Sequence, residues 1–173
     1  MERSAPERRN AIAAEVPRLT RYACALIRDR READDLVHDC VVRALANLSS
    51  WRDGDSPRKW LFTIMHNIHI DQMRARKRSP VHVELEEQHQ SASVVHPSDD
   101  VTRSEINAAM AALPLEQRQC VLLVGLEGLT YAEAADVLGV PAGTIMSRLS
   151  RGRERLRDLL DRDTARPTLR RVK

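Results

Sequence analysis

LTYAEAADVLGVPAGTIMSRLSRGRERLR, residues 129 to 157, is the stretch that decides the fold. Thr130 followed three residues later by Glu133 is the capping-box signature of a helix start, and Gly139 is typical of the residue just past a helix end. Val140 to Gly143 then leave only a tight connection before the next helix. The pattern predicts two helices joined by a short turn.

The second of these helices has an apolar face and a basic face. Thr144 is a suitable N-cap for it, and the apolar spacing continues to Leu160. Small residues at Ala135 and Gly139 allow the two helices to cross closely. The inward stripe consists of Ile145, Leu149, Gly152 and Leu156. A helix that reads bases in the major groove needs short polar groups near its start, and arginines beside them; the candidates are Thr144, Met146, Ser147, Arg148, Arg151 and Arg153.

Composition favours helices along the whole chain, because aromatic residues make up only 3% of its 173 residues and helix formers are plentiful. With 42% hydrophobic residues the chain can bury one modest core or two small ones, and the layout favours two. No apolar run reaches the roughly 20 residues that cross a bilayer, so we expect a cytoplasmic protein without membrane insertion. Three widely spaced cysteines, Cys24, Cys40 and Cys120, are expected to be core residues rather than disulfides or zinc ligands.

The N-terminal part, residues 11 to 78, shows the same helical spacing, interrupted once. Its clearest apolar stripe consists of Leu36, Val37, Cys40, Val41, Ala44, Leu45 and Leu48. Trp51 to Lys59 contains Gly54 and Pro57 and is expected to be a loop. A further helix is predicted from Trp60 to about Arg76.

A polar stripe on this last helix is a candidate nucleic-acid surface. Asn67, Asp71 and Arg74 are four and three residues apart, so they share one face. Arg76, Lys77 and Arg78 follow and add positive charge. Hydrogen-bonding groups beside phosphate-binding charge suit an opened DNA strand.

These patterns predict an all-α protein with two small helical domains joined by a flexible linker, the C-terminal domain containing a helix-turn-helix. The expected boundaries are a disordered N-terminus at 1–10, a first domain at 11–78, a linker at 79–100, a second domain at 101–162 and a basic tail at 163–173.

Three segments of the chain resemble the extracytoplasmic-function (ECF) family of RNA polymerase sigma factors. EADDLVHDCVVRAL (Glu32 to Leu45) is similar to the main polymerase-binding helix of the family. WRDGDSPRKWLFTIMHNIHIDQMRARKR (Trp51 to Arg78) is similar to its loop and helix for the downstream promoter element. LPLEQRQCVLLVGLEGLTYAEAADVLGVPAGTIMSRLSRGRERLR (Leu113 to Arg157) is similar to its helix-turn-helix for the upstream element. The resemblance identifies the first domain as sigma region 2 and the second as sigma region 4.

The resemblance also implies roles for single residues. Asp35, His38 and Asp39 would contact the clamp helices of core RNA polymerase, with His38 in place of the usual Gln. A base flipped from the non-template strand would be held by the loop and the polar stripe, that is by Trp51, Arg52, Asp53, Ser56, Asn67 and Asp71. The upstream element would face Ser147, Arg148, Arg151 and Arg153, while Met146 replaces a basic residue common in relatives.

The implied function is that of an alternative sigma factor, which directs promoter-specific initiation in response to a stress or environmental signal. Its partners would be core RNA polymerase, promoter DNA and an anti-sigma factor, with no small-molecule substrate, no cofactor and no covalent chemistry of its own.

Two other readings remain open at this stage. A repressor or activator would share the helix-turn-helix and act without polymerase, but it has no need for the surface from Asn67 to Arg78. A metal-dependent hydrolase could use His66, His69 and Asp71, but no further ligand pair or general base has suitable spacing.

Overall fold

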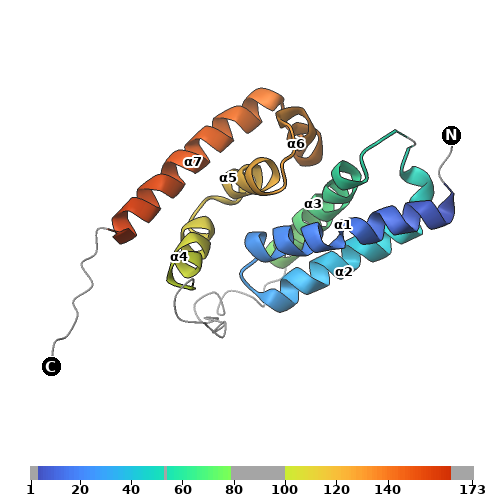
Figure 1. Ribbon diagram of the computed structural model, residues 1–173, viewed down its shortest axis with the longest axis horizontal. Helices are drawn as coiled ribbons and strands as arrows, with labels where there is room; N and C mark the ends of the chain where they lie inside the picture. The colour runs from blue at the N-terminus through green and yellow to red at the C-terminus, as the bar shows by residue number, and fades with distance from the viewer. Residues whose placement is uncertain (1–3, 53, 79–99, 165–173) are drawn as a thin grey trace.

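The computed structural model describes residues 4–52, 54–78 and 100–164, with residues 100–103 and 162–164 described by their backbone alone. Helices make up nearly all of the described chain, and no strand occurs in it, which confirms the predicted all-α class (Figure 1). Residues 79–99 of the expected linker and 165–173 of the expected tail lie outside the described residues. None of the helices in the described part is long and apolar enough to cross a membrane.

Three long helices form the N-terminal half, and four helices with a π-helical turn form the C-terminal half (Figure 1). The N-terminal half contains α1 (Ala5–Leu26), α2 (Arg30–Ala46), the short 3-10 helix η1 (Leu48–Ser50) and α3 (Pro57–Arg78). The C-terminal half contains α4 (Asp100–Ala111), α5 (Leu115–Cys120), the π-helix η2 (Val121–Leu126), α6 (Tyr131–Leu138) and α7 (Ala142–Thr164).

Helix α1 begins earlier than the sequence pattern indicates. The backbone N–H of Ser4 donates to a Glu7 carboxylate oxygen at 2.7 Å, and Pro6 occupies the first turn, where its missing N–H costs nothing. Residues 5–10, which were expected to belong to a disordered terminus of residues 1–10, are therefore helical.

Helix α3 also begins earlier than predicted, at Pro57 instead of Trp60. A proline at the first helical position is favourable because its fixed φ suits a helix start. The expected loop of Trp51 to Lys59 accordingly ends at Ser56.

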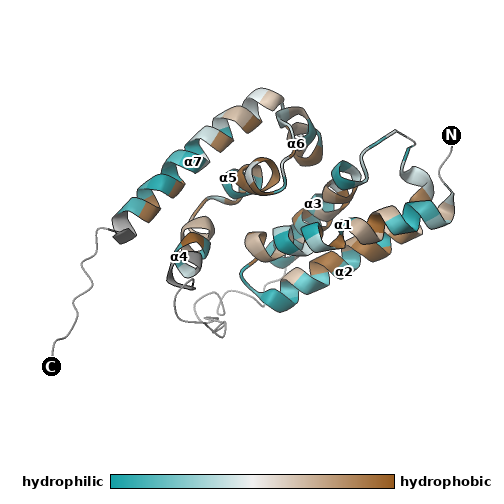
Figure 2. Ribbon diagram, in the orientation of Figure 1, coloured by the Kyte–Doolittle hydropathy of each residue, from teal (hydrophilic) through white to brown (hydrophobic). Residues whose placement is uncertain are grey.

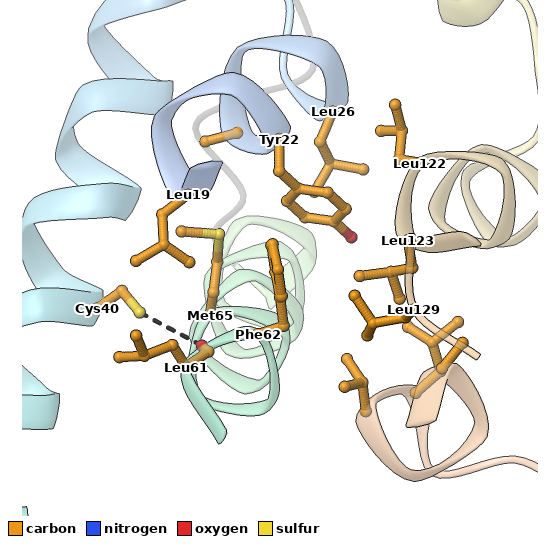
Figure 3. Close-up of a cluster of buried hydrophobic side chains, with 14 of the residues drawn as sticks. Leu19, Tyr22, Leu26, Cys40, Leu61, Phe62, Met65, Leu122, Leu123 and Leu129 are labelled. Atoms are coloured by element: carbon orange, nitrogen blue, oxygen red, sulfur yellow. Dashed lines mark hydrogen bonds between the residues drawn. The ribbon is translucent and has the colours of Figure 1, made fainter. Parts of the chain in front are cut away.

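The helices of the N-terminal half pack around a core that contains Leu19, Leu36, Leu61 and Met65. Cys40 belongs to this core, where its thiol donates to the Leu61 carbonyl at 3.5 Å and burial raises its pKa to about 12 (Figure 3). Cys120 is also buried, whereas Cys24 is exposed, so the expectation of a core position is wrong for Cys24.

The helix-turn-helix is confirmed in its local detail. The Thr130 hydroxyl accepts from the Glu133 N–H at 3.2 Å, and the Glu133 carboxylate accepts from the Thr130 N–H at 2.8 Å. These hydrogen bonds lower the pKa of Glu133, and Gly139 ends α6 with a left-handed φ of 63°. Helix α7 begins at Ala142, so Thr144 lies in its first turn rather than at its cap.

The predicted helix from Leu115 to about Leu126 changes character in its middle. At Val121 the α-helix becomes the π-helix η2, and the Glu127 N–H donates to the Leu122 carbonyl, five residues back, at 3.0 Å. A π-helical turn shifts the following side chains around the helix axis and is frequent at functional sites. Here it precedes Glu127, a carboxylate that is almost completely buried.

The two halves pack against each other instead of forming separate cores. Tyr22 of α1 and Phe62 of α3 face Leu122, Leu123 and Leu129 of the C-terminal half (Figure 3). Hydropathy follows this packing: α7 is mostly hydrophilic, apart from a strip that includes the buried Ile145 and Leu149 (Figure 2). The described helices form two regions, as predicted, but their buried residues make one continuous core and not the two separate cores that the layout favoured.

Close packing of α7 on α5 and η2 depends on Gly152. A Cβ atom at this position would lie 3.0 Å from a methyl carbon of Val121 and 3.4 Å from Gln117. We predict that Gly152→Val lowers the free energy of unfolding by about 1–3 kcal/mol, because the added methyl groups overpack this contact. Urea denaturation measures the change. The control is Gly143→Ala in the same helix, where a Cβ meets nothing within 4 Å, and an equal loss in both variants would contradict the prediction.

Candidate nucleic-acid interface

The outer face of α7 presents most of the residues predicted to read DNA. Met146, Ser147, Arg151 and Arg153 are exposed, and Met146 is 55% exposed despite its apolar side chain. Arg151 is held along the helix, because its Nε donates to the Ser147 carbonyl at 3.2 Å and its Nη2 to the Ser147 hydroxyl at 3.3 Å. This face therefore combines a pre-positioned guanidinium with short polar groups.

The structure separates two residues of the predicted set from that face. Arg148 is half-buried and its Nη2 forms an ion pair with Glu116 of α5 at 2.6 Å. Thr144 is half-buried as well, and its N–H donates to the Pro141 carbonyl at 2.9 Å. The Arg148 side chain therefore joins α7 to α5 in this conformation.

A groove of about 480 Å³ runs beside the exposed face of α7. Tyr131 at the start of α6 lines one side of the groove. The other side consists of α7 residues between Met146 and Arg157, namely Met146, Leu149, Ser150, Arg153, Glu154 and Arg157. An open groove with arginines along one wall is suited to a phosphate backbone.

The polar stripe predicted on α3 is exposed throughout. Asn67, Asp71, Arg74, Arg76, Lys77 and Arg78 all face solvent. Two of its arginines are partly neutralised, since Arg74 lies 4.0 Å from Asp71 and Arg76 makes a 3.0 Å ion pair with Glu32 of α2. Asn67 is left with its amide available, one turn away from these charges.

The side chains of Trp51 and Arg8 hold the loop before α3 in place. Trp51 is 2% exposed, stacks on Trp60 at 5.6 Å between ring centroids, and donates from Nε1 to the Asp55 carbonyl at 3.1 Å. The Arg8 guanidinium of α1 donates to the carbonyls of Leu48 and Trp51 at 2.7 and 2.8 Å. Trp51 is therefore a buried packing residue of this loop, and its contact with a flipped base stays a prediction.

The other loop residues in the predicted set differ in exposure. Arg52 is exposed, Ser56 is half-buried, and Asp53 lies outside the described residues. Arg8 was not predicted, because it lies more than 40 residues before the loop that it braces and no local pattern links the two.

Helix α2 turns a mixed acidic and apolar face to solvent. Asp35, His38 and Asp39 are exposed as predicted. One and two turns further along the same face, Val42 is 52% and Leu45 is 42% exposed, although the sequence pattern had placed Leu45 in the core stripe. An exposed apolar pair beside carboxylates is a feature of a protein-binding surface.

His66 and His69 face the C-terminal half rather than solvent. His66 Nδ1 lies 3.3 Å from the Gln119 amide of α5, and His69 is buried, whereas Asp71 is exposed. Among the described residues no group of three or more His, Cys, Asp or Glu side chains is placed to hold a metal ion. The structure does not assemble the hydrolase site considered from the sequence.

A helix-turn-helix with an exposed basic face, joined to a helical half with a second polar and basic stripe, defines a DNA-binding transcription factor. The profile of sigma-70 region 4 matches residues 103–156, and the profile of the sigma2 domain of PhyR matches residues 12–66. The ECF RNA polymerase sigma factor EcfG of Rhodopseudomonas palustris is 36% identical over 157 residues, which cover 91% of this chain and 87% of the relative.

Further relatives support the same family. The ECF RNA polymerase sigma factor SigC of Mycobacterium tuberculosis is 34% identical over 140 residues, covering 76% of this chain and 72% of the relative. Among solved structures, the sigma factor RpoE in complex with the anti-sigma factor NepR from Bartonella quintana has a TM-score of 0.76 and 32% identity, covering 88% of this chain and 95% of RpoE. The chain belongs to the ECF family of RNA polymerase sigma factors, which bind core polymerase and direct it to particular promoters.

Burial of the two histidines predicts a pH dependence of stability. Burial lowers the pKa of both, and for His69 the nearby His66, Arg76 and Arg118 lower it further while Glu32 opposes them. Below the ordinary value of 6.5 the unfolded chain therefore binds more protons than the folded chain. The free energy of unfolding is therefore highest above pH 6.5. It decreases as the pH falls from 6.5 toward the lowered pKa values of the two histidines in the folded protein.

Urea denaturation at pH 7.5 and pH 5.5 measures this effect. We expect His69→Gln to reduce the pH dependence, while the same substitution at the exposed His38 leaves it unchanged. An undiminished pH dependence in the His69 variant would show that this buried histidine is not its source.

Proposed function

We propose that this sigma factor binds its partners through three separate exposed surfaces. The α2 face binds core polymerase, the loop and stripe of α3 bind the opened downstream element, and the outer face of α7 binds the upstream element. The observation that carries this proposal is that all three faces remain exposed while the helices bury their other sides in one core.

Polymerase binding is assigned to α2 because its exposed face has both components of a protein interface. Val42 and Leu45 supply apolar area, and Asp35, His38 and Asp39 surround it with polar groups. Asp39 accepts from the Gln72 amide of α3 at 3.3 Å, which holds one carboxylate in place before binding. Core polymerase would cover this patch on docking.

Substituting Val42 tests this surface. We expect Val42→Asp to weaken binding to purified core polymerase roughly tenfold, about 1.4 kcal/mol, because a charge would replace apolar contact at the interface. Fluorescence anisotropy of the labelled protein titrated with core polymerase measures the affinity. The matched control is Ile106→Asp on α4, another exposed apolar position at 42% exposure. Equal losses in both variants would refute a specific role for α2.

Downstream recognition is assigned to the braced loop and the α3 stripe together. Asn67 and Asp71 offer hydrogen-bonding groups to an unpaired base, and Arg74, Arg76, Lys77 and Arg78 offer positive charge to the strand that carries it. Arg52 is exposed and Ser56 is half-buried in the loop that the buried Trp51 helps to shape. The aromatic content of 3% leaves few side chains that could wedge between bases.

Upstream recognition is assigned to Met146, Ser147, Arg151 and Arg153. Arg151 is the strongest candidate for a base contact, because its guanidinium is already ordered against Ser147 near the start of α7. Arg148 would contribute only after leaving Glu116, and Thr144 only through its half-buried hydroxyl.

Two arginines of α7 should differ in what they read. Arg151→Ala should lose about 1–3 kcal/mol of promoter binding at one base pair of the upstream element, because a base contact discriminates by that amount. Arg155 is exposed one turn beyond Arg151 on α7. Arg155→Ala should weaken binding to every sequence alike, as expected for a phosphate contact. Binding of the polymerase complex to duplexes with single base changes separates the two. Uniform losses for both variants would contradict the division of roles.

The protein is proposed to act without covalent chemistry and in the cytoplasm, with catalysis supplied by polymerase. An anti-sigma factor is the expected regulator, since the relative RpoE was solved in complex with one. Transcription in vitro with purified core polymerase and a genomic promoter pool tests the function as a whole. We expect RNA chains that start at defined sites only when the protein is present; chains that start at the same sites without it would overturn the proposal.

A further inference from the structure

The start of α7 presents an apolar patch on a helix that is otherwise charged. Met146 is 55% exposed, more than any other large hydrophobic side chain in the part of the chain that the structure describes. Tyr131 of α6, which lies beside the first turns of α7 (Figure 1), is 40% exposed. Both side chains and the buried Leu149 line the groove of about 480 Å³. Apolar surface that water can reach is a contact site for an apolar group of a partner.

This groove changes from apolar to charged along α7. Met146, Ser150, Arg153 and Arg157 are four, three and four residues apart, so they share one face of the helix. An α-helix rises about 1.5 Å per residue, which places Arg153 about 10 Å further along α7 than Met146. This separation is comparable with the width of the DNA major groove, roughly 12 Å. With its apolar end over the base edges, the charged end therefore reaches a phosphate backbone.

Charge determines which class of partner fits the groove. Arg153 and Arg157 outnumber Glu154 at its charged end, and on the adjacent face Arg151 is held by the Ser147 carbonyl. A polyanion that also presents a small apolar group satisfies both ends of the groove. Duplex DNA is such a partner, because the C5-methyl of thymine is the apolar group that the standard bases present in the major groove. The first turns of the second helix of a helix-turn-helix lie at the base edges.

We infer that Met146 reads the methyl group of a thymine in the upstream promoter element, with Tyr131 and Leu149 completing the apolar contact. This inference rests on the proposed function, because it assigns the chemical group that one part of the outer face of α7 selects. A methionine side chain is unbranched and polarisable, so it adapts to a methyl group without a fixed geometry. The contact involves no hydrogen bond, so it selects pyrimidines that have a C5-methyl group.

Replacing thymine by uracil tests this contact, because uracil lacks only the C5-methyl group. The duplex contains a promoter that the polymerase complex recognises in vitro, and each thymine of its upstream element is replaced singly on either strand. We expect one replacement to weaken binding of the complex roughly fourfold, which corresponds to about 0.8 kcal/mol for one methyl-sized group. The other replacements should leave the affinity unchanged. Fluorescence anisotropy of the labelled duplex measures the affinity.

Variants of Met146 connect the methyl effect with this side chain. Met146→Gln has a similar length but a polar end, so it should bind the thymine and uracil duplexes equally. Met146→Leu stays apolar and should retain the fourfold ratio. The control is Arg153→Gln in the same groove, which should weaken binding to both duplexes and leave their ratio unchanged. All three substitutions are at exposed positions, and urea denaturation checks that the fold is intact.

A second comparison adds the methyl group instead of removing it. A cytosine–guanine pair is placed at the position that the uracil series identifies, and the cytosine is then methylated at C5. The two cytosines have the same hydrogen-bonding groups, so only the apolar contact changes. Methylation should strengthen wild-type binding roughly fourfold and leave the affinity of Met146→Gln unchanged.

The inference is overturned if no uracil replacement weakens binding, or if Met146→Gln retains the methyl effect. Weaker binding of Met146→Gln to core polymerase without DNA would show that the groove contacts protein, and it would overturn the inference as well. In these cases the complex still recognises the promoter, so the proposed function stands. A protein that brings polymerase to no promoter would instead overturn the proposed function, and the reading of thymine with it.

Discussion

The contact between an aromatic pair and a π-helical turn determines how the whole molecule is arranged. Tyr22 and Phe62 meet edge to face at 5.0 Å between ring centroids, with 67° between their planes. Phe62 is the only phenylalanine of the chain, and it lies at the boundary between the two halves. Leu122 and Leu123 of the π-helix η2 complete the contact, since both are buried in the same cluster.

Local signals allowed the fold class and the helix-turn-helix to be predicted. The capping box of Thr130 and Glu133 and the left-handed Gly139 act within a few residues, so their physics is contained in a short window of sequence. The exposed faces of α2, α3 and α7 follow from helical periodicity for the same reason. The errors at Ala5 and Pro57 are boundary errors, and at Pro57 a proline at a helix start was interpreted as a loop signal.

The remaining features depend on contacts that no local pattern encodes. Arg21 and Glu127 are 106 residues apart, and Arg8 and Trp51 are 43 apart. Periodicity shows on which face of its helix a charged residue lies, but not which other helix will cover that face. In the sequence Glu127 therefore looks like an ordinary surface acid. Arg148 illustrates the converse, because a residue predicted to face DNA is bound by Glu116 of α5.

The functional faces stay exposed because each helix buries only its other side in the shared core. Arg76 of the α3 stripe is exposed and also lines the cavity between α1, α2, α3 and α5, so this stripe reaches the boundary between the two halves. At that boundary the apolar cluster of Tyr22 and Phe62 lies beside the buried carboxylate of Glu127. A carboxylate is tolerated there because Arg21 binds both of its oxygens.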